Sequence, residues 1–206
     1  MLRIWGRLSS VNVQKVVWCA DELGCPYERI DAGRQFGIVG TDEFRRLNPN
    51  RQIPVIQDGE FVLWESNAIL RYLCAKHSLG DLCPEPLTER ADADRWMDWQ
   101  ATELSPAMSK AFVQWIRTPP HGREPALIEA SVQATRLLVR LLDEHLEGRR
   151  FVCGTRMTMA DISMGCAVHR WFGLPIEQES LPNLVAWYRR VSERPAARAV
   201  LTLPLQ

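Results

Sequence analysis

The side chains with the clearest chemistry lie in one stretch, residues 48–72. Glu65 and Ser66 stand where a helical pattern begins, and the free N–H groups of a helix start favour an anion such as a carboxylate. Glu65 can hold an ammonium group beside it. Pro54 interrupts an apolar strand pattern, and a cis Ile53–Pro54 bond would explain it, turning the main chain of Ile53 outward to pair with an extended peptide. These residues predict a receptor for a small peptide-like ligand with an α-amino-acid end.

Three elements must position these groups. Residues 52–56 form a short apolar strand pattern, and Asp58-Gly59 is a dipeptide typical of a tight hairpin turn. Residues 61–64 then predict a second strand. A helix follows from Glu65-Ser66, with apolar residues at helical spacing.

The chain before this stretch predicts a β-α-β unit. Residues 2–5 and 26–30 have strand patterns, and residues 13–23 have a helical pattern that ends at Gly24. Sequential parallel strands need such a crossover helix. A short helix capped by Thr41 follows, so the first part of the chain reads βαβ-α-ββα.

The second part of the chain has only helical patterns. Residues 78–87 contain Gly80, Pro84 and Pro86 and predict a linker. Residues 88–117 form a long amphipathic stretch that Pro106 should kink or break. Further helices are expected from Pro125, from the capping pattern 158–161, and after Pro182.

Composition excludes several classes of function. Lys plus Arg and Asp plus Glu are both 25, and the absence of net charge argues against a nucleic-acid partner. No run of 18 apolar residues predicts a membrane span, and the apolar start is too short for a signal peptide. Six scattered cysteines show no metal-ligand spacing. We therefore expect a cytoplasmic protein with reduced thiols, no metal and no membrane partner.

The run Ile53-Pro54-Val55, then Asp58-Gly59, then residues 64–73 closely resembles the glutathione-binding half of cytosolic glutathione S-transferases. The downstream helical half matches the same family. The resemblance is to bacterial serine-type members (zeta-, theta- or nu-like). It implies an α+β protein with a thioredoxin-like domain in residues 1–79 and an all-helical domain in residues 88–206. It also implies a homodimer.

Such an enzyme must keep the thiol of glutathione ionised, because the thiolate is the nucleophile. Ser10 and Asn12 offer O–H and N–H donors at the start of the first helix, where the helix dipole is positive. The family pattern Ser/Thr-x-Asn assigns both of them to the sulfur, with Lys15 as the basic residue a few positions on. Ser9 is the alternative, and any one of Ser9, Ser10 and Asn12 would otherwise simply cap the helix. The loop holds no Tyr and no Cys, which excludes a tyrosine-type enzyme and counts against an omega-like thiol transferase.

The resemblance also assigns the rest of the glutathione site. Ile53, held by the cis Pro54, would bind the cysteinyl main chain, and Glu65 and Ser66 the γ-glutamyl end. Gln52 would meet the glycyl carboxylate. Weaker candidates for glutathione contacts are Arg34, Gln35 and Glu103.

A pocket for the second substrate is expected between the domains, against the long helix. Its predicted lining is Met108, Phe112, Trp115 and Arg117, and Arg117 would suit an anionic or peroxide-like substrate. The predicted function is therefore a glutathione S-transferase, active in detoxification, that adds the glutathione thiolate to a small electrophile. Glutathione-dependent disulfide or peroxide reduction, isomerisation, and a non-catalytic glutathione-binding module remain the alternatives.

Overall fold

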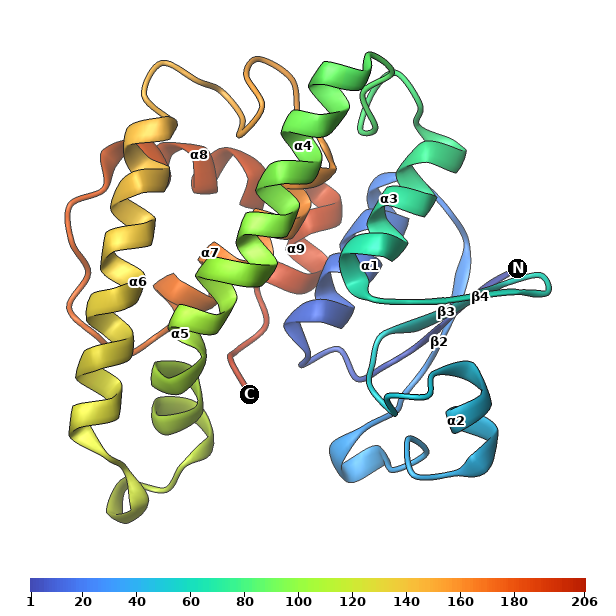
Figure 1. The fold of residues 1–206 in the computed structure, drawn as a ribbon, viewed down its shortest axis with the longest axis horizontal. Helices are drawn as coiled ribbons and strands as arrows, with labels where there is room; N and C mark the ends of the chain where they lie inside the picture. The colour runs from blue at the N-terminus through green and yellow to red at the C-terminus, as the bar shows by residue number, and fades with distance from the viewer.

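The computed structural model describes all residues from 1 to 206. The first part of the chain has the element order β1 (Leu2–Trp5), α1 (Val11–Glu22), β2 (Tyr27–Ile30), η1 (Arg34–Phe36), α2 (Asp42–Leu47), β3 (Val55–Asp58), β4 (Phe61–Trp64) and α3 (Ser66–His77). This is the predicted βαβ-α-ββα order, with a short 3-10 turn added at η1. Figure 1 shows these elements together on one side of the molecule.

The four strands form one mixed sheet in the order β2-β1-β3-β4. β1 and β2 are parallel, because α1 crosses between them, and β3 pairs antiparallel with both β1 and β4. The predicted strand at 52–56 is shifted: β3 begins at Val55, so Pro54 lies just before the ladder and removes no hydrogen bond from it.

The second part of the chain is helical. Its elements are α4 (Leu87–Trp99), η2 (Gln100–Leu104), α5 (Ser105–Phe112), η3 (Val113–Arg117), η4 (Pro120–Gly122), α6 (Pro125–His145), α7 (Met159–Phe172), α8 (Pro182–Ser192) and α9 (Pro195–Leu201). The α+β class, with a thioredoxin-like first part and an all-helical second part, is confirmed. The division at residues 79 and 88 stays a prediction.

The break predicted at Pro106 takes the form of a π-helical segment. η2 and η3 are both π-helical, and Pro106 stands in the first turn of α5, directly after η2, so the N–H that proline lacks falls at the junction of the π and α pieces. The segment 88–117 is thus a chain of α and π pieces. The single last helix expected after Pro182 is in fact two, α8 and α9, because Pro195 starts a new helix.

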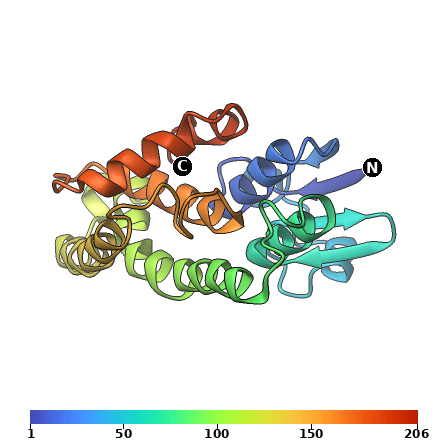
Figure 2. The ribbon, with the colours of Figure 1, turned by 90° about the horizontal axis from the view of Figure 1, so that it is seen from above.

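The two parts share a continuous core. In Figure 2, α1 and α3 lie between the sheet and the helical part. A cluster of 45 buried apolar residues runs from Ile4 in the sheet through Trp18 of α1 to Trp187 of α8. A small separate cluster around Phe44 packs α2 against the other side of the sheet. No helix is both long enough and apolar enough to cross a membrane.

Candidate functional site

Ser10 is the N-cap residue of α1, but its hydroxyl does not cap the helix. Its carbonyl accepts the first helical bond from the Gln14 N–H at 2.9 Å, while its side chain makes no capping hydrogen bond. The backbone at Ser10 is extended, as is usual for an N-cap residue. The hydroxyl of Ser10 is therefore free to donate to a ligand beside the helix start.

Asn12 lies in the first turn of α1 and is exposed. It lines a cavity of about 470 Å³ that also contains Glu65 and Ser66. Ser9, the alternative donor, lines a different cavity of about 230 Å³ together with Arg7. Asn12, unlike Ser9, thus shares a cavity with the predicted ligand-binding end of α3.

Glu65 and Ser66 meet at the N-terminus of α3. Glu65 is the N-cap residue and has a φ of +71°, in the left-handed region that a non-glycine residue rarely adopts. Such backbone conformations cost about 1–3 kcal/mol and concentrate at binding sites. Ser66, the first residue of α3, is only 6% exposed, so its hydroxyl lies in a largely dry place at the positive end of the helix.

The Ile53–Pro54 peptide bond is cis, as the sequence predicted. The main-chain N–H and C=O of Ile53 make no hydrogen bond within the chain, so both are available to an extended ligand. Gln52 is exposed, and its carbonyl accepts from the Nδ2 of Asn48 at 2.9 Å, which fixes the loop before the proline.

The helical part closes one wall of the Asn12 cavity. Asp98, Gln100, Ala101 and Ser105 join the lining from the helical part. Arg71 of α3, also in the lining, forms ion pairs with Asp94 and Asp98 of α4 at 2.5 Å each. The weaker candidates Arg34, Gln35 and Glu103 are all exposed and outside this lining. The predicted glutathione-binding residues Asn12, Glu65 and Ser66 of the thioredoxin-like domain thus share one cavity with residues of the helical domain.

A buried polar network under this cavity was missed by the sequence analysis. Lys15 is 2% exposed, and its Nζ donates to Gln100 Oε1 at 2.6 Å and to Asn67 Oδ1 at 3.3 Å. The Ser163 hydroxyl lies 2.8 Å and 2.9 Å from the same two oxygens. Burial lowers the pKa of Lys15 to about 8. The network ties α1, α3, η2 and α7 together; its partners are far apart in the chain, so spacing gave no signal for it.

The residues predicted for the second substrate divide into two groups. Met108 is 1% and Phe112 2% exposed, and both belong to the core, so they leave almost no surface for a substrate. Arg117 is exposed and its guanidinium lies 4.7 Å from the centre of the Phe112 ring. Trp115 is half-buried against Arg123, at 4.9 Å. Of the four, Arg117 has the most accessible side chain.

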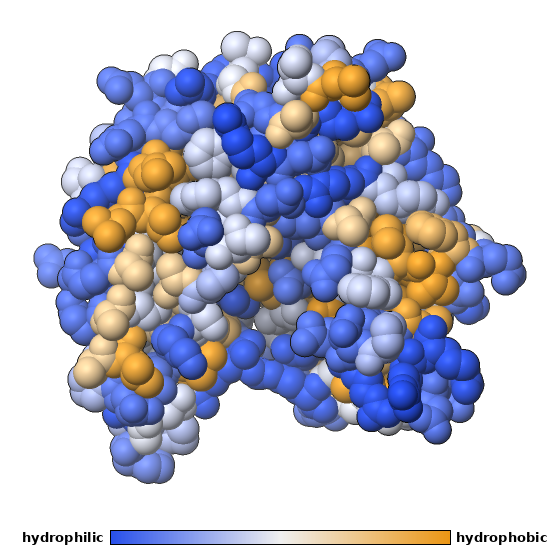
Figure 3. Space-filling model, viewed as in Figure 1, coloured by the Kyte–Doolittle hydropathy of each residue, from blue (hydrophilic) through white to orange (hydrophobic).

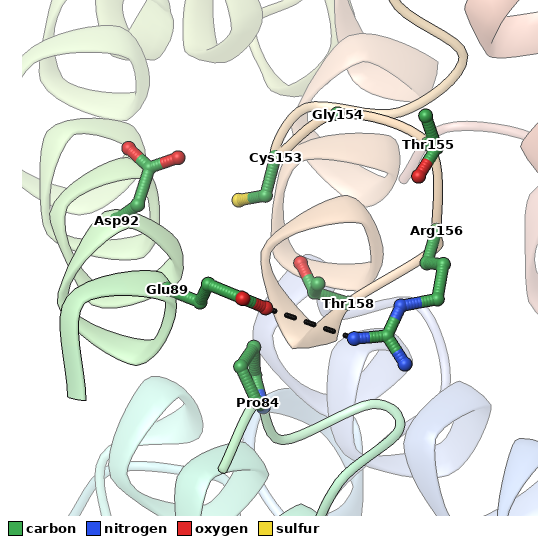
Figure 4. Close-up of a pocket in the computed structure, with 8 residues that line it drawn as sticks. All are labelled: Pro84, Glu89, Asp92, Cys153, Gly154, Thr155, Arg156 and Thr158. Atoms are coloured by element: carbon green, nitrogen blue, oxygen red, sulfur yellow. Dashed lines mark ion pairs between the residues drawn. The ribbon is translucent and has the colours of Figure 1, made fainter. Parts of the chain in front are cut away.

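A further cavity of about 380 Å³ lies between α4 and the loop before α7, and none of the predicted residues lines it. Figure 4 shows its lining, with Glu89 and Asp92 from α4 facing Cys153 and Arg156 from the loop. Glu89 and Arg156 form an ion pair at 3.6 Å. Burial raises the pKa of Cys153 to about 12, so this thiol is a poor nucleophile at neutral pH.

Comparison with known proteins identifies the family. The model for the glutathione S-transferase N-terminal domain matches residues 1–75, and the C-terminal domain model matches residues 104–195. Glutathione S-transferase GstB of Escherichia coli (strain K12) is 39% identical over 207 residues, covering all of both chains. The chain belongs to the glutathione S-transferase family.

Two further relatives place this transferase near the theta class. Mouse glutathione S-transferase theta-3 is 30% identical over 205 residues, covering 92% of this chain and 81% of the mouse protein. The theta class transferase of Xanthomonas axonopodis pv. citri, solved with glutathione bound, is 41% identical with a TM-score of 0.96, covering 100% and 99% of the two chains. The theta-like character expected of this transferase is confirmed.

Proposed function

We propose that this transferase binds glutathione in the cavity between α1, α3 and η2 and adds its thiolate to a small electrophile. The observation that carries the proposal is the meeting of Asn12, Glu65 and Ser66 in one cavity of about 470 Å³. The glutathione-bound relative from Xanthomonas supports the choice of ligand.

Each part of glutathione has a partner of matching chemistry. Ser66 and the α3 N-terminus take the γ-glutamyl carboxylate, and Glu65 takes its ammonium group. The free N–H and C=O of Ile53, which is followed by the cis Pro54, pair with the cysteinyl main chain. Gln52 takes the glycyl carboxylate.

Ser10 and Asn12 hold the sulfur as thiolate. A free thiol has a pKa of about 8.5, so lowering it by about 2 requires about 2.7 kcal/mol of preferential stabilisation of the anion. The uncommitted Ser10 hydroxyl and the Asn12 amide supply hydrogen bonds at the positive end of α1. The proton of the thiol leaves to solvent before the sulfur attacks.

The cellular setting follows from this chemistry. We place the protein in the cytoplasm, where glutathione is the abundant thiol, as a detoxification enzyme that forms a homodimer like other members of its family. The loop 6–10 holds no cysteine to form a mixed disulfide, which argues against an omega-like thiol transferase that reacts through its own cysteine.

The test is a pH titration of the ultraviolet thiolate band of bound glutathione. We expect a pKa well below that of the free thiol. No binding, or binding without that decrease, would favour a non-catalytic module.

Ser10→Ala should raise the pKa of the bound thiol by about 1 to 2, because one hydrogen bond to the anion is lost. The dissociation constant of glutathione should stay within a few fold. Ser9→Ala is the matched control and should leave the pKa unchanged. The reverse pattern would assign the role to Ser9, and no effect of either variant would assign it to Asn12.

A further inference from the structure

Four arginines from the two domains lie near enough to one another for their charges to interact. Arg7 belongs to the loop between β1 and α1, Arg34 to η1, Arg117 to the end of η3 and Arg170 to the last turn of α7. None of them forms an ion pair with an acidic side chain, whereas Arg71 in the neighbouring cavity pairs with two aspartates. These four residues are called the arginine cluster below.

Two members of the arginine cluster, Arg117 and Arg170, make cation–π contacts with the ring of Phe112. The guanidinium carbon of Arg170 lies 3.8 Å from the centre of the ring, and that of Arg117 lies 4.7 Å from it. Each cation is attracted to the ring, but the two repel each other. The aromatic contact therefore positions two positive charges close together without neutralising either one.

Arg7 completes the cluster from the thioredoxin-like domain. Its Nη1 lies 3.0 Å from the place where a Cβ on Gly33 would stand, which puts the guanidinium against the turn that carries Arg34. The Nε of Arg7 is buried and has no hydrogen-bond partner. A buried donor left without a partner costs about 1–3 kcal/mol, so an acceptor that reached this nitrogen would recover that free energy.

Burial and mutual repulsion lower the pKa values of three of these arginines. Burial lowers the pKa of Arg7, and Arg34 lowers it further. Burial is also the main cause that lowers the pKa of Arg117, and the charges of Arg34 and Arg7 add to it. Burial, then Arg117, lowers the pKa of Arg170 to about 10. An anion placed among them would relieve both effects.

A cavity lies beside the arginine cluster, and Arg7 is the member of the cluster that lines it. It measures about 230 Å³ and is lined by Arg7, Ser9 and the C-terminal Gln206 among others. Gln206 also connects it to Arg117, whose Nη2 donates to the Gln206 carbonyl at 3.5 Å. Asp31, an acidic residue in the lining, is already paired with Arg29. Figure 3 shows the notch between the domains, with hydrophilic residues along most of its edge.

We propose that the second substrate of this transferase carries a carboxylate, which Arg117 and Arg170 bind from the helical domain while Arg7 and Arg34 enclose it from the other side. The proposal rests on the proposed function, because it names the class of electrophile that the glutathione thiolate attacks. Arginine suits the task, since its planar guanidinium binds a carboxylate through two parallel hydrogen bonds. The Gln206 carbonyl gives up its weak bond to Arg117 when the substrate enters.

A matched pair of electrophiles tests the proposal: para-(chloromethyl)benzoate and its methyl ester. In both, the thiolate forms the S–C bond as the C–Cl bond breaks and chloride leaves with the electron pair. We expect kcat/KM for the carboxylate to exceed that for the ester by at least about tenfold, as for a hydrogen bond to a charged group. Arg117→Gln should reduce this preference by about tenfold. Arg45→Gln, which removes an exposed, unpaired arginine from α2, should leave the preference unchanged.

A binding measurement separates this proposal from the proposed function. The unreactive para-methylbenzoate is titrated into the glutathione-saturated protein, and its methyl ester serves as the neutral control. Tighter binding of the carboxylate, lost in Arg117→Gln, is the expected result. Equal binding of the two compounds, or unchanged binding in Arg117→Gln, would overturn the carboxylate site even if the bound thiol titrates low. A high pKa of the bound thiol would instead overturn the proposed thiolate chemistry alone.

Discussion

Ser66 combines three properties that a carboxylate-binding residue needs. It is the first residue of α3, it is nearly buried, and the strained backbone of Glu65 directs the start of the helix. Burial matters because a hydrogen bond to a charged group is stronger where water is excluded. The same serine on an exposed helix start would contribute little.

Ser66→Ala should therefore weaken glutathione binding by about 1.5–3 kcal/mol, the usual contribution of a hydrogen bond to a charged group. Isothermal titration with glutathione measures the change. Ser180→Ala, at an exposed loop position between α7 and α8, is the control and should bind glutathione like the unmodified protein. A loss near zero for Ser66→Ala would remove this residue from the site.

Lys15 gives the protein a pH dependence with a definite sign. Its pKa is about 8 in the folded protein against the ordinary lysine value of 10.5, so folding disfavours the charged form. The destabilisation is fully present below pH 8 and disappears as the pH rises towards 10.5. Relative to Lys15→Met, the unmodified protein should thus gain about 2–3 kcal/mol of unfolding free energy between about pH 7 and pH 10. Urea unfolding of both proteins at the two pH values measures this, and parallel changes would show that burial does not alter the pKa of Lys15.

At the scale of elements, the start of α7 shows how one carboxylate organises three segments. Asp161 accepts the Val152 N–H at 2.9 Å, the Thr158 N–H at 2.9 Å and the Trp187 Nε1–H at 2.8 Å. The capping box with Thr158, predicted from sequence, is present. The bonds to Val152 and Trp187 go beyond a cap, because they attach the preceding loop and α8 to the same helix start.

Asp161→Asn should lower the unfolding free energy by about 2–4 kcal/mol, because the amide NH₂ would face a buried N–H that the carboxylate now satisfies. Thr158→Ser is the control, since it keeps the capping hydroxyl and removes one methyl group, for about 1 kcal/mol. Chemical denaturation measures both. Equal losses would mean that the carboxylate contributes no more than a methyl group.

The sequence predicted elements whose signals are local. The capping box at Thr158, the hairpin turn at Asp58-Gly59 and the helix stop at Gly24 all depend on neighbouring residues, and each lies where expected. The cis bond before Pro54 was predicted because a proline among apolar strand residues needs an explanation. In contrast, no spacing rule indicates the π-helical form of η2 and η3.

In the candidate site, too, the sequence predicted the residues with local signals and missed those that only the fold brings together. The position of Glu65 and Ser66 at a helix start predicted them as binding residues, and they do share a cavity with Asn12. Lys15 and Gln100 are 85 positions apart, and Arg7 and Arg170 are still farther apart in the chain, so only the folded chain brings each pair together. Met108 and Phe112 were assigned to a pocket because a helical stripe looks alike whether it faces a core or a cavity.

At the scale of the whole molecule, the two domains depend on one shared core. Trp18 of α1 is fully buried, and its Nε1 donates to Glu22, which also pairs with Arg194 just before α9. Gly165 of α7 lies against the Trp18 ring, where a Cβ would come within 2.8 Å of Cζ3. The close approach of α1 and α7 therefore requires glycine at this position.

Gly165→Ala should separate α1 from α7 and destabilise both domains at once. The added methyl cannot fit against a fully buried ring, and such overpacking costs about 1–3 kcal/mol. Because the core is continuous, we expect one unfolding transition at lower denaturant concentration, seen alike in tryptophan fluorescence and in glutathione binding. Gly40→Ala is the control, since a Cβ at Gly40 meets nothing within 4 Å and the backbone there is unstrained. Two separate transitions in Gly165→Ala would show instead that the thioredoxin-like domain keeps its glutathione site without support from the helical one.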